Sequence, residues 1–306
     1  MAITLLENFR AVFYAPFYAA SALGAFDAQG LEVKVQASPD AALTMQTLLS
    51  GAGDVSWGGP LRLMLAREKA PAQEPIVFCE AVGHDPFFLI GREPNANFRH
   101  SDLLDKRLGI VTEVPTPWMC LQHDLRLAGL DPARIRVSRD RTMAENADAL
   151  RSREIDVAQL FQPYAAELLQ SGQGHLWYAA ANRGPVAYTT LNTTREYARR
   201  NPETLLALCR AMYETQKWIA NHDGAALAKV LATYFPTVPH STLAASFDSY
   251  LGVGLSNKTP IMYREGFEWL RDAALADGLL HTRFEYEEIA DMSFAQQVLD
   301  EEAPEK

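Results

Sequence analysis

The stretch YAPFYAASALGAFDAQGLEVKVQ, residues 14–36, places a helix, a stop and a strand in close succession. Pro16 suits the first turn of a helix, where its missing N–H costs nothing. Gly24 and then Gly30 interrupt the helix, and the following LEVKV alternates apolar and charged side chains as a half-buried strand does. Residues 3–9 are a second strand candidate upstream. The unit therefore reads strand, helix, strand, which predicts a parallel sheet.

The loop ENFRAVFY, residues 7–14, lies between the first predicted strand and the helix. In sheets of this kind ligands bind beside the carboxyl ends of the strands. Asn8, Phe9, Phe13 and Tyr14 are therefore candidates to contact a ligand. The alternative is that these aromatic rings only close the hydrophobic core.

Length and charge exclude several classes of function. The chain has 306 residues, which is about two domains' worth. Its 28 basic and 38 acidic side chains give a net charge of −10, which argues against a nucleic-acid partner and against adhesion to an anionic membrane. No apolar window approaches the length needed to span a bilayer, so no membrane insertion is expected.

Metal and disulfide signals are absent from the sequence pattern. Cys79, Cys120 and Cys209 are far apart and odd in number, so we expect small buried hydrophobic residues rather than a disulfide framework or a zinc site. The seven histidines are dispersed and show no metal-ligand spacing. We therefore expect neither a metal nor a cofactor.

Strand–helix units continue to about residue 185, and the chain is helical from Asn201 onward. The middle block forms a lobe of its own that two crossing segments reach. We expect an α/β protein of two βα lobes with a helical C-terminal part, in which residues 1–86 with 186–306 form lobe I and 87–185 form lobe II. A cleft between lobes joined in this way can close on a small ligand.

The order of these pieces resembles the substrate-binding proteins of the nitrate, sulfonate and thiamine-precursor type. They have the bilobal type II periplasmic-binding-protein fold, which the enzymes that make the thiamine pyrimidine precursor share. The matching phrases, in order along the whole chain, are APFYAASALGAFDAQGLEVKV, LLSGAGDVSWGG, LLDKRLGIVTE, REIDVAQLFQPYAAELLQSG, NPETLLALCRAMYETQKWI and YREGFEWLRDAALADGLL.

The resemblance implies a ligand cleft at places that also follow predicted strands. For Gly58 and Gly59 the alternative is a tight turn, and for His84 and Asp85 it is a role in fixing the crossing strand. With the residues of the first loop, the candidates are Trp57, Gly58, Gly59, His84, Asp85, Thr112, Glu113, Gln162, Tyr164 and Tyr188.

Glu113, in the loop VTEVPT, indicates the charge of the ligand. In many relatives this loop and the following helix hold an anion through backbone amides. Here Pro115 and Pro117 remove two donors and Glu113 adds a negative charge, which favours an amine, a heterocycle or a hydroxyl-bearing ring. The alternative is that Glu113 complements the helix dipole. An anionic ligand would need a compensating cation, for which the candidates are Arg10, Arg62 and Arg183.

The related enzymes use a lysine that holds pyridoxal phosphate, a histidine and a cysteine-rich run. Here the corresponding positions are Gly58, Arg62 and GPVAYTTL, so the amine that a Schiff base needs is missing. We therefore expect no catalytic residues. We expect a monomeric receptor that delivers a small polar, aromatic or heterocyclic solute to the permease of an ABC importer. The alternative is a cytosolic enzyme on the same fold, related to thiamine-pyrimidine synthesis or acting as a decarboxylase or lyase, with Glu113 or Asp85 as base.

The N-terminus lacks the basic segment, apolar run and cleavage site of a signal peptide. A receptor of this type would be periplasmic if a leader has been removed. If Met1 is the native start, the protein would be cytoplasmic. The sequence leaves both alternatives open.

Overall fold

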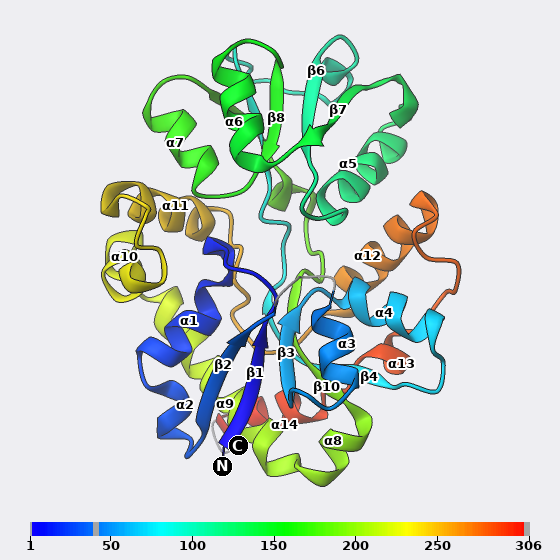
Figure 1. Cartoon of the computed structure of the whole chain (residues 1–306), viewed down its shortest axis with the longest axis vertical. Helices are drawn as coiled ribbons and strands as arrows, with labels where there is room; N and C mark the ends of the chain where they lie inside the picture. Colours follow the sequence, from blue (N-terminus) through cyan, green and yellow to red (C-terminus); the bar gives the residue numbers. More distant parts are fainter. Residues whose placement is uncertain (1, 39–42, 303–306) are drawn as a thin grey trace.

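Two five-stranded sheets form the framework of two lobes, one above the other in Figure 1. The structure, a computed structural model, describes residues 2–38 and 43–302. The strands lie in the order β2-β1-β3-β10-β4 in the first sheet and β7-β6-β8-β5-β9 in the second. Their bounds are β1 Ala2–Glu7, β2 Glu32–Ala37, β3 Val55–Gly58, β4 Pro75–Val82, β5 Phe88–Gly91, β6 Arg107–Val111, β7 Arg136–Arg141, β8 Val157–Leu160, β9 His175–Ala179 and β10 Thr189–Thr194.

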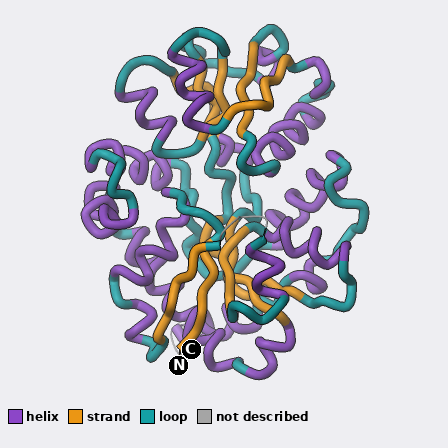
Figure 2. Tube along the Cα trace, viewed as in Figure 1, coloured by secondary structure: helices purple, strands orange, loops and turns teal. Residues whose placement is uncertain are grey.

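Helices pack around both sheets (Figure 2). Most helices before β10 are separated from one another by strands, whereas those after β10 follow one another without an intervening strand. Their bounds are α1 Ala15–Ala22, α2 Ala25–Ala28, α3 Thr44–Leu49, α4 Pro60–Lys69, α5 Thr116–Leu127, α6 Met143–Arg151, α7 Tyr164–Gln170, α8 Arg195–Arg200, α9 Pro202–Ala220, α10 Gly224–Leu231, α11 His240–Gly252, α12 Arg264–Asp277, α13 Tyr286–Ile289 and α14 Ser293–Glu302.

The opening stretch forms the predicted unit. Gly24 and Gly30 adopt φ of 70° and 69°, which side chains disfavour, and they end α1 and α2. Strand β2 runs parallel to β1, with Val33 opposite Ile3, which confirms the predicted parallel pairing. The expectation that β2 is half-buried is wrong. Because β2 is the edge strand of its sheet, only Val33 is partly covered and the rest of the strand is exposed.

The path of the chain between the sheets confirms the two lobes and their two crossing segments. After β4 the chain leaves the first sheet, builds the second, and returns as β10, which lies antiparallel between β3 and β4. The strands of the first sheet come from residues 2–82 and 189–194, and those of the second from 88–179. Strand β9 was not expected from the sequence. It pairs antiparallel with β5 at the edge of the second sheet.

The C-terminal helices touch both lobes. Helix α11 packs against α7, and α12 packs against α5, so each flank of the second lobe rests on a helix that follows β10 (Figure 1). Residues 300–302 belong to α14, where the guanidinium of Arg210 donates to the carboxylate of Glu301 at 2.7 and 2.8 Å. Residues 303–306 lie outside the described part of the chain.

The cysteines and the hydropathy of the helices agree with the sequence analysis. Cys79, Cys120 and Cys209 are free thiols with no exposed surface, as predicted. They pack as small apolar side chains. Within residues 2–38 and 43–302, no helix combines the length and the apolar character that crossing a bilayer requires.

A buried ion cluster joins the two crossing segments to the second lobe. Arg183, in the returning segment, donates to the carboxylate of Asp85 in the outgoing segment at 2.6 Å. The same guanidinium donates from Nε to both oxygens of Asp124 on α5 at 3.0 Å, and from Nη2 to one of them. It also lies 5.0 Å from the ring centre of Trp269 on α12. Burial opposes the charge of Arg183, but the two carboxylates hold its pKa well above the ordinary value.

We predict that Arg183→Ala lowers the free energy of unfolding by about 3 to 5 kcal/mol, because it leaves two buried carboxylates without a counter-ion. Urea titration followed by circular dichroism measures this change. The matched control is Arg264→Ala, which removes an arginine from an exposed ion pair with Glu287 and should leave the unfolding midpoint almost unchanged. Equal effects of the two substitutions would contradict a structural role for the cluster.

Candidate functional site

A cavity of about 280 Å³ lies between the two lobes. Loops that follow β1 and β3 line it from the first lobe, loops that follow β6 and β8 line it from the second, and both crossing segments contribute. This is the edge at which ligands bind in open α/β sheets. The lining residues are Asn8, Phe9, Phe13, Tyr14, Gly59, Leu61, Arg62, Leu65, Phe87, Glu113, Val114, Pro115, Thr116, Phe161, Ala187, Tyr188 and Leu270.

A second cavity of about 380 Å³ adjoins the first. The two have Phe9, Glu113, Val114 and Phe161 in common as wall residues. The second is lined in addition by Arg10, Ala11, Val12, Met143, Gln162, Pro163, Tyr164, Phe235, Thr237 and Val238. We call the first the main cavity and the second the side cavity.

Aromatic rings from both lobes meet at the main cavity. Phe13, between β1 and α1, lies with its ring centre 5.3 Å from that of Phe161, which follows β8. Phe161 in turn contacts Phe87 of the first crossing segment, also at 5.3 Å, and Phe13 contacts Tyr188 at 6.0 Å. Phe9 lies 5.2 Å from Tyr14. The rings form an apolar wall of the kind that packs against a planar ligand.

Glu113 is the carboxylate of this wall. Its Oε1 accepts a hydrogen bond of 2.9 Å from the backbone N–H of Met143, the first residue of α6. The sequence analysis left two roles open for Glu113, a contact with the ligand or an interaction with a helix dipole. The dipole contact exists, but it is made to α6 and not to the helix that follows Glu113 in the chain.

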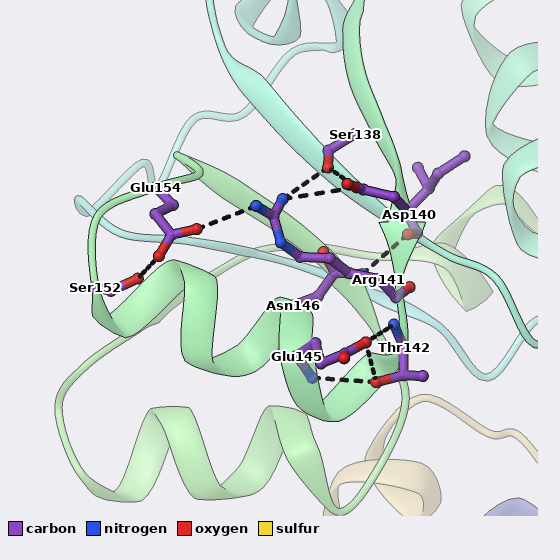
Figure 3. A network of polar contacts seen from close by, with 9 residues as sticks. Ser138, Asp140, Arg141, Thr142, Glu145, Asn146, Ser152 and Glu154 are labelled. Carbon is purple, nitrogen blue, oxygen red and sulfur yellow. Dashed lines mark hydrogen bonds and ion pairs between the residues drawn. The ribbon is translucent and has the colours of Figure 1, made fainter.

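A polar network holds the turn that presents Met143 to Glu113 (Figure 3). Arg141 donates to the hydroxyl of Ser138 at 2.7 Å and to the carboxylate of Glu154 at 3.0 Å. Thr142 and Glu145 form a reciprocal capping box at the start of α6. Nδ2 of Asn146 donates to the carbonyl of Ile110 at 2.9 Å, which ties α6 to β6. These bonds fix the position of Glu113 through its partner.

The first lobe contributes a polar corner to the main cavity through Asn8 and Tyr14. Nδ2 of Asn8 donates to the hydroxyl of Tyr14 at 3.3 Å, and Oδ1 of Asn8 accepts from the hydroxyl of Thr44 at 3.1 Å. Burial raises the pKa of Tyr14 to about 12, although the Asn8 hydrogen bond and the charge of Arg62 oppose the shift. Tyr14 is therefore a neutral phenol at physiological pH, and its hydroxyl proton can be donated to a ligand.

The structure brings together seven of the predicted site residues on the main cavity. They are Asn8, Phe9, Phe13, Tyr14, Gly59, Glu113 and Tyr188. Close packing favours a glycine at position 59, because a Cβ there would lie 3.0 Å from the carbonyl oxygen of Tyr188. Gln162 and Tyr164 line the side cavity. The side chain of Gln162 already accepts from Ala166 at 2.8 Å and donates to Ser249 at 3.1 Å, so it also fixes the start of α7.

Five predicted residues lie away from both cavities. Trp57 is in the core, stacked on Phe17 of α1 with ring centres 4.8 Å apart, because its place within β3 directs it toward α1. The carbonyl of Gly58 accepts from Thr190 at 3.0 Å. Asp85 is held by Arg183, and His84 lines a smaller cavity of about 150 Å³ beside the crossing segments. Thr112 is exposed and lines neither cavity.

The three candidate cations lie in different places. Arg62, on the first turn of α4, lines the main cavity. Arg10 lines the side cavity, where its guanidinium donates to both oxygens of Glu7 at 2.6 and 2.9 Å. Arg183 belongs to the buried cluster with Asp85 and Asp124. Of the three, Arg62 is the one that lines the main cavity.

Sequence reasoning missed several wall residues. Phe161 ends an apolar run that reads as a buried strand, and only its place directly before the predicted Gln162 could have indicated it. Leu270 comes from α12, more than a hundred residues after the wall residues of the second lobe, and no local signal marks it. In the described residues, no group of three or more histidine, cysteine or acidic side chains is arranged to hold a metal ion.

Two lobes joined by two crossing segments, with a cavity between them, define the type II periplasmic-binding-protein fold. The chain belongs to the NMT1/THI5-like family, whose model matches residues 12–226. It is 25% identical to the "Putative binding protein YtlA" of Bacillus subtilis (strain 168) over 302 residues, which cover 98% of this chain and 90% of that protein.

Solved structures confirm the fold. The periplasmic aliphatic sulphonate binding protein SsuA from Escherichia coli superimposes with a TM-score of 0.75 at 15% identity, over 94% of this chain and 96% of SsuA. The desulfurization enzyme DszB superimposes with a TM-score of 0.71 at 15% identity, over 98% of this chain and 99% of DszB. At this identity the likeness shows the architecture alone.

We predict that Trp57→Phe lowers the free energy of unfolding by about 1 to 3 kcal/mol, because it leaves part of the stacked core unfilled. It should not change the affinity for any compound that binds the main cavity. Urea unfolding measures the first effect and calorimetric titration the second. A loss of ligand affinity with unchanged stability would instead place Trp57 in the binding site.

Proposed function

We propose that this protein is a solute receptor that closes its two lobes around one small polar, aromatic or heterocyclic molecule and delivers it to the permease of an ABC importer. The observation that carries the proposal is the composition of the main cavity, whose wall comes from both lobes and both crossing segments. A ligand that contacts both lobes favours their closed arrangement by its differential affinity. The similarity to YtlA and SsuA supports a binding role.

The proposed lobes are residues 1–86 with 186–306, and residues 87–185, with the hinge near Pro86 and Pro185. The wall residues Asn8, Phe9, Phe13, Tyr14, Gly59, Glu113 and Tyr188 would contact the ligand. A receptor that serves an importer acts outside the cytoplasmic membrane, so we propose a periplasmic location and action as a monomer.

An enzyme on the same fold is the second candidate, and the similarity to DszB is the observation that favours it. The sequence analysis named Asp85 and Glu113 as candidate bases for such an enzyme. Asp85 is engaged by Arg183 away from the cavities, so that role falls to Glu113 alone. A general base must reach the proton that it removes. The two functions differ in the fate of the bound molecule.

We predict that protein purified from its own organism retains one small molecule, which native mass spectrometry detects as a mass difference abolished by denaturation. The molecule should be released chemically unchanged after prolonged incubation. When added back to stripped protein, it should stabilise the fold by about 2.7 kcal/mol at a hundredfold excess over its Kd. Conversion of the molecule during incubation would refute the receptor and favour the enzyme.

We also predict that the retained molecule makes the protein more compact in solution. Closure of the lobes on the ligand lowers the radius of gyration, which small-angle X-ray scattering of stripped and saturated protein measures. The control is a variant that occupies the main cavity, Ala187→Trp, which should give no ligand-dependent change. An unchanged radius at saturation in the parent protein would count against a hinge at the crossing segments.

A further inference from the structure

We infer that the cavity of about 150 Å³ beside the crossing segments, which we call the small cavity, is a second binding site that takes a primary ammonium group. Its lining comes from β4, both crossing segments, the loop after α11 and the first turn of α12. Among the described residues, Ala187 alone lines both this cavity and the main cavity. The inference goes beyond the proposed receptor function and does not depend on it.

Glu80 gives the small cavity a buried carboxyl group with one unused oxygen. The residue lies in β4, is 2% exposed and lines the cavity. Its Oε2 accepts a hydrogen bond of 2.5 Å from Nδ2 of Asn257. No donor of the described chain bonds to its Oε1. Because buried polar atoms are normally hydrogen-bonded, the donor for Oε1 comes from a molecule in the cavity.

The donors closest to Glu80 are already bound elsewhere. Nδ2 of Asn257 also donates to the carbonyl of Ile261 at 3.3 Å, so both of its protons are engaged. The backbone N–H of Tyr188 donates to the carbonyl of Val82 at 3.1 Å. Neither group can turn to Oε1 without losing a hydrogen bond of its own, which is costly for a buried group.

Two further acceptors line the small cavity. Nδ1 of His84 is buried and has no hydrogen-bond partner in the described part of the chain. Burial lowers the pKa of His84, so the imidazole is neutral at physiological pH, and Nδ1 accepts when the ring proton is on Nε2. Glu265, on the first turn of α12, adds an exposed carboxylate.

These acceptors fit a primary ammonium. Such a group has three N–H donors, and Glu80, His84 and Glu265 offer it one acceptor each. Of the residues that the structure describes, no lysine or arginine lines the cavity, so an anion would lack a counter-charge. The described histidine, cysteine and acidic side chains form no group of three that could hold a metal ion. The volume has room for several water molecules and hence for one small amine.

Binding of a cation should remove the proton of Glu80. Burial raises the pKa of this carboxyl group well above its ordinary value. A neighbouring positive charge favours the carboxylate, so a proton passes to the buffer, and the affinity rises with pH until Glu80 is ionised in the free protein. The other titratable groups close to Glu80 are His84 and Glu265 in the cavity, and Cys79 and Tyr286, whose pKa values its charge raises.

Three salts test the class of ligand: methylammonium chloride, tetramethylammonium chloride and potassium chloride. Calorimetric titration at constant ionic strength should show that methylammonium binds at least about tenfold more tightly than the other two cations, because neither of them has an N–H to donate to a charged group. Equal or tighter binding of tetramethylammonium or potassium overturns the proposal, as does the absence of saturable binding of methylammonium.

Two substitutions test the acceptors. Glu80→Gln should weaken methylammonium binding at least about tenfold and abolish the proton release, which titration in buffers of different ionisation enthalpy measures. Glu265→Gln should weaken it about two- to fivefold, as expected for an exposed charge. Unchanged affinity or proton release in Glu80→Gln overturns the proposal. If circular dichroism shows that this variant does not fold, unchanged affinity in Glu265→Gln overturns it.

Matched controls locate the bound ammonium. Glu287→Gln removes an exposed carboxylate outside the small cavity and should leave the affinity unchanged. If it weakens binding as much as Glu265→Gln does, net charge is the cause and the proposal fails. Glu113→Gln removes the carboxylate of the main cavity. Loss of methylammonium binding in that variant but not in Glu80→Gln would place the ammonium in the main cavity and refute the second site.

Discussion

Strand β10 lies antiparallel between β3 and β4, and the rest of the molecule depends on this insertion. A strand in the interior of a sheet pairs with a neighbour on each side. Because β4 is one neighbour of β10, the chain that leaves the first sheet after β4 must return to β4. The second lobe is therefore connected by two segments that lie side by side. The cavity forms where these segments meet the strand ends of both sheets.

The buried cluster around Arg183 holds the region of the crossing segments together by ion pairs and hydrogen bonds. It joins Asp85 of the outgoing segment, Asp124 of α5 and Trp269 of α12 through one guanidinium. A buried arginine with two carboxylates contributes geometry more than net stability, since desolvation offsets much of its attraction. Its planar fork fixes the relative positions of its partners. The outgoing crossing segment, α5 and α12 are thereby held in fixed relative positions.

The fold could be predicted because its signals are local. The glycines at positions 24 and 30 and the alternating strand that follows them act within a few residues, and the repetition of such units implies the sheets. The site could be predicted less well from the sequence, because its wall is made by side chains from distant segments. Trp57 follows the same strand-end rule as Gly59, yet the alternation of side chains along β3 directs it into the core. No spacing rule could place Leu270 of α12 on the wall of the same cavity as Phe13.

Glu113 shows why a local pattern can indicate a residue and still leave its role open. Its loop indicated a contact with a helix dipole or with a ligand, and the structure gives it a hydrogen bond to α6 together with a place on the wall of both cavities. These roles support each other. The backbone donor of Met143 keeps one oxygen fixed, so the carboxylate does not have to be ordered again when a ligand arrives, and less conformational entropy is lost on binding. The network around Arg141 and Asn146 extends this order into the second lobe. In the proposed ligand contact, a carboxylate held in this way would discriminate by charge at little cost in affinity, because the cost of positioning it is met when the protein folds.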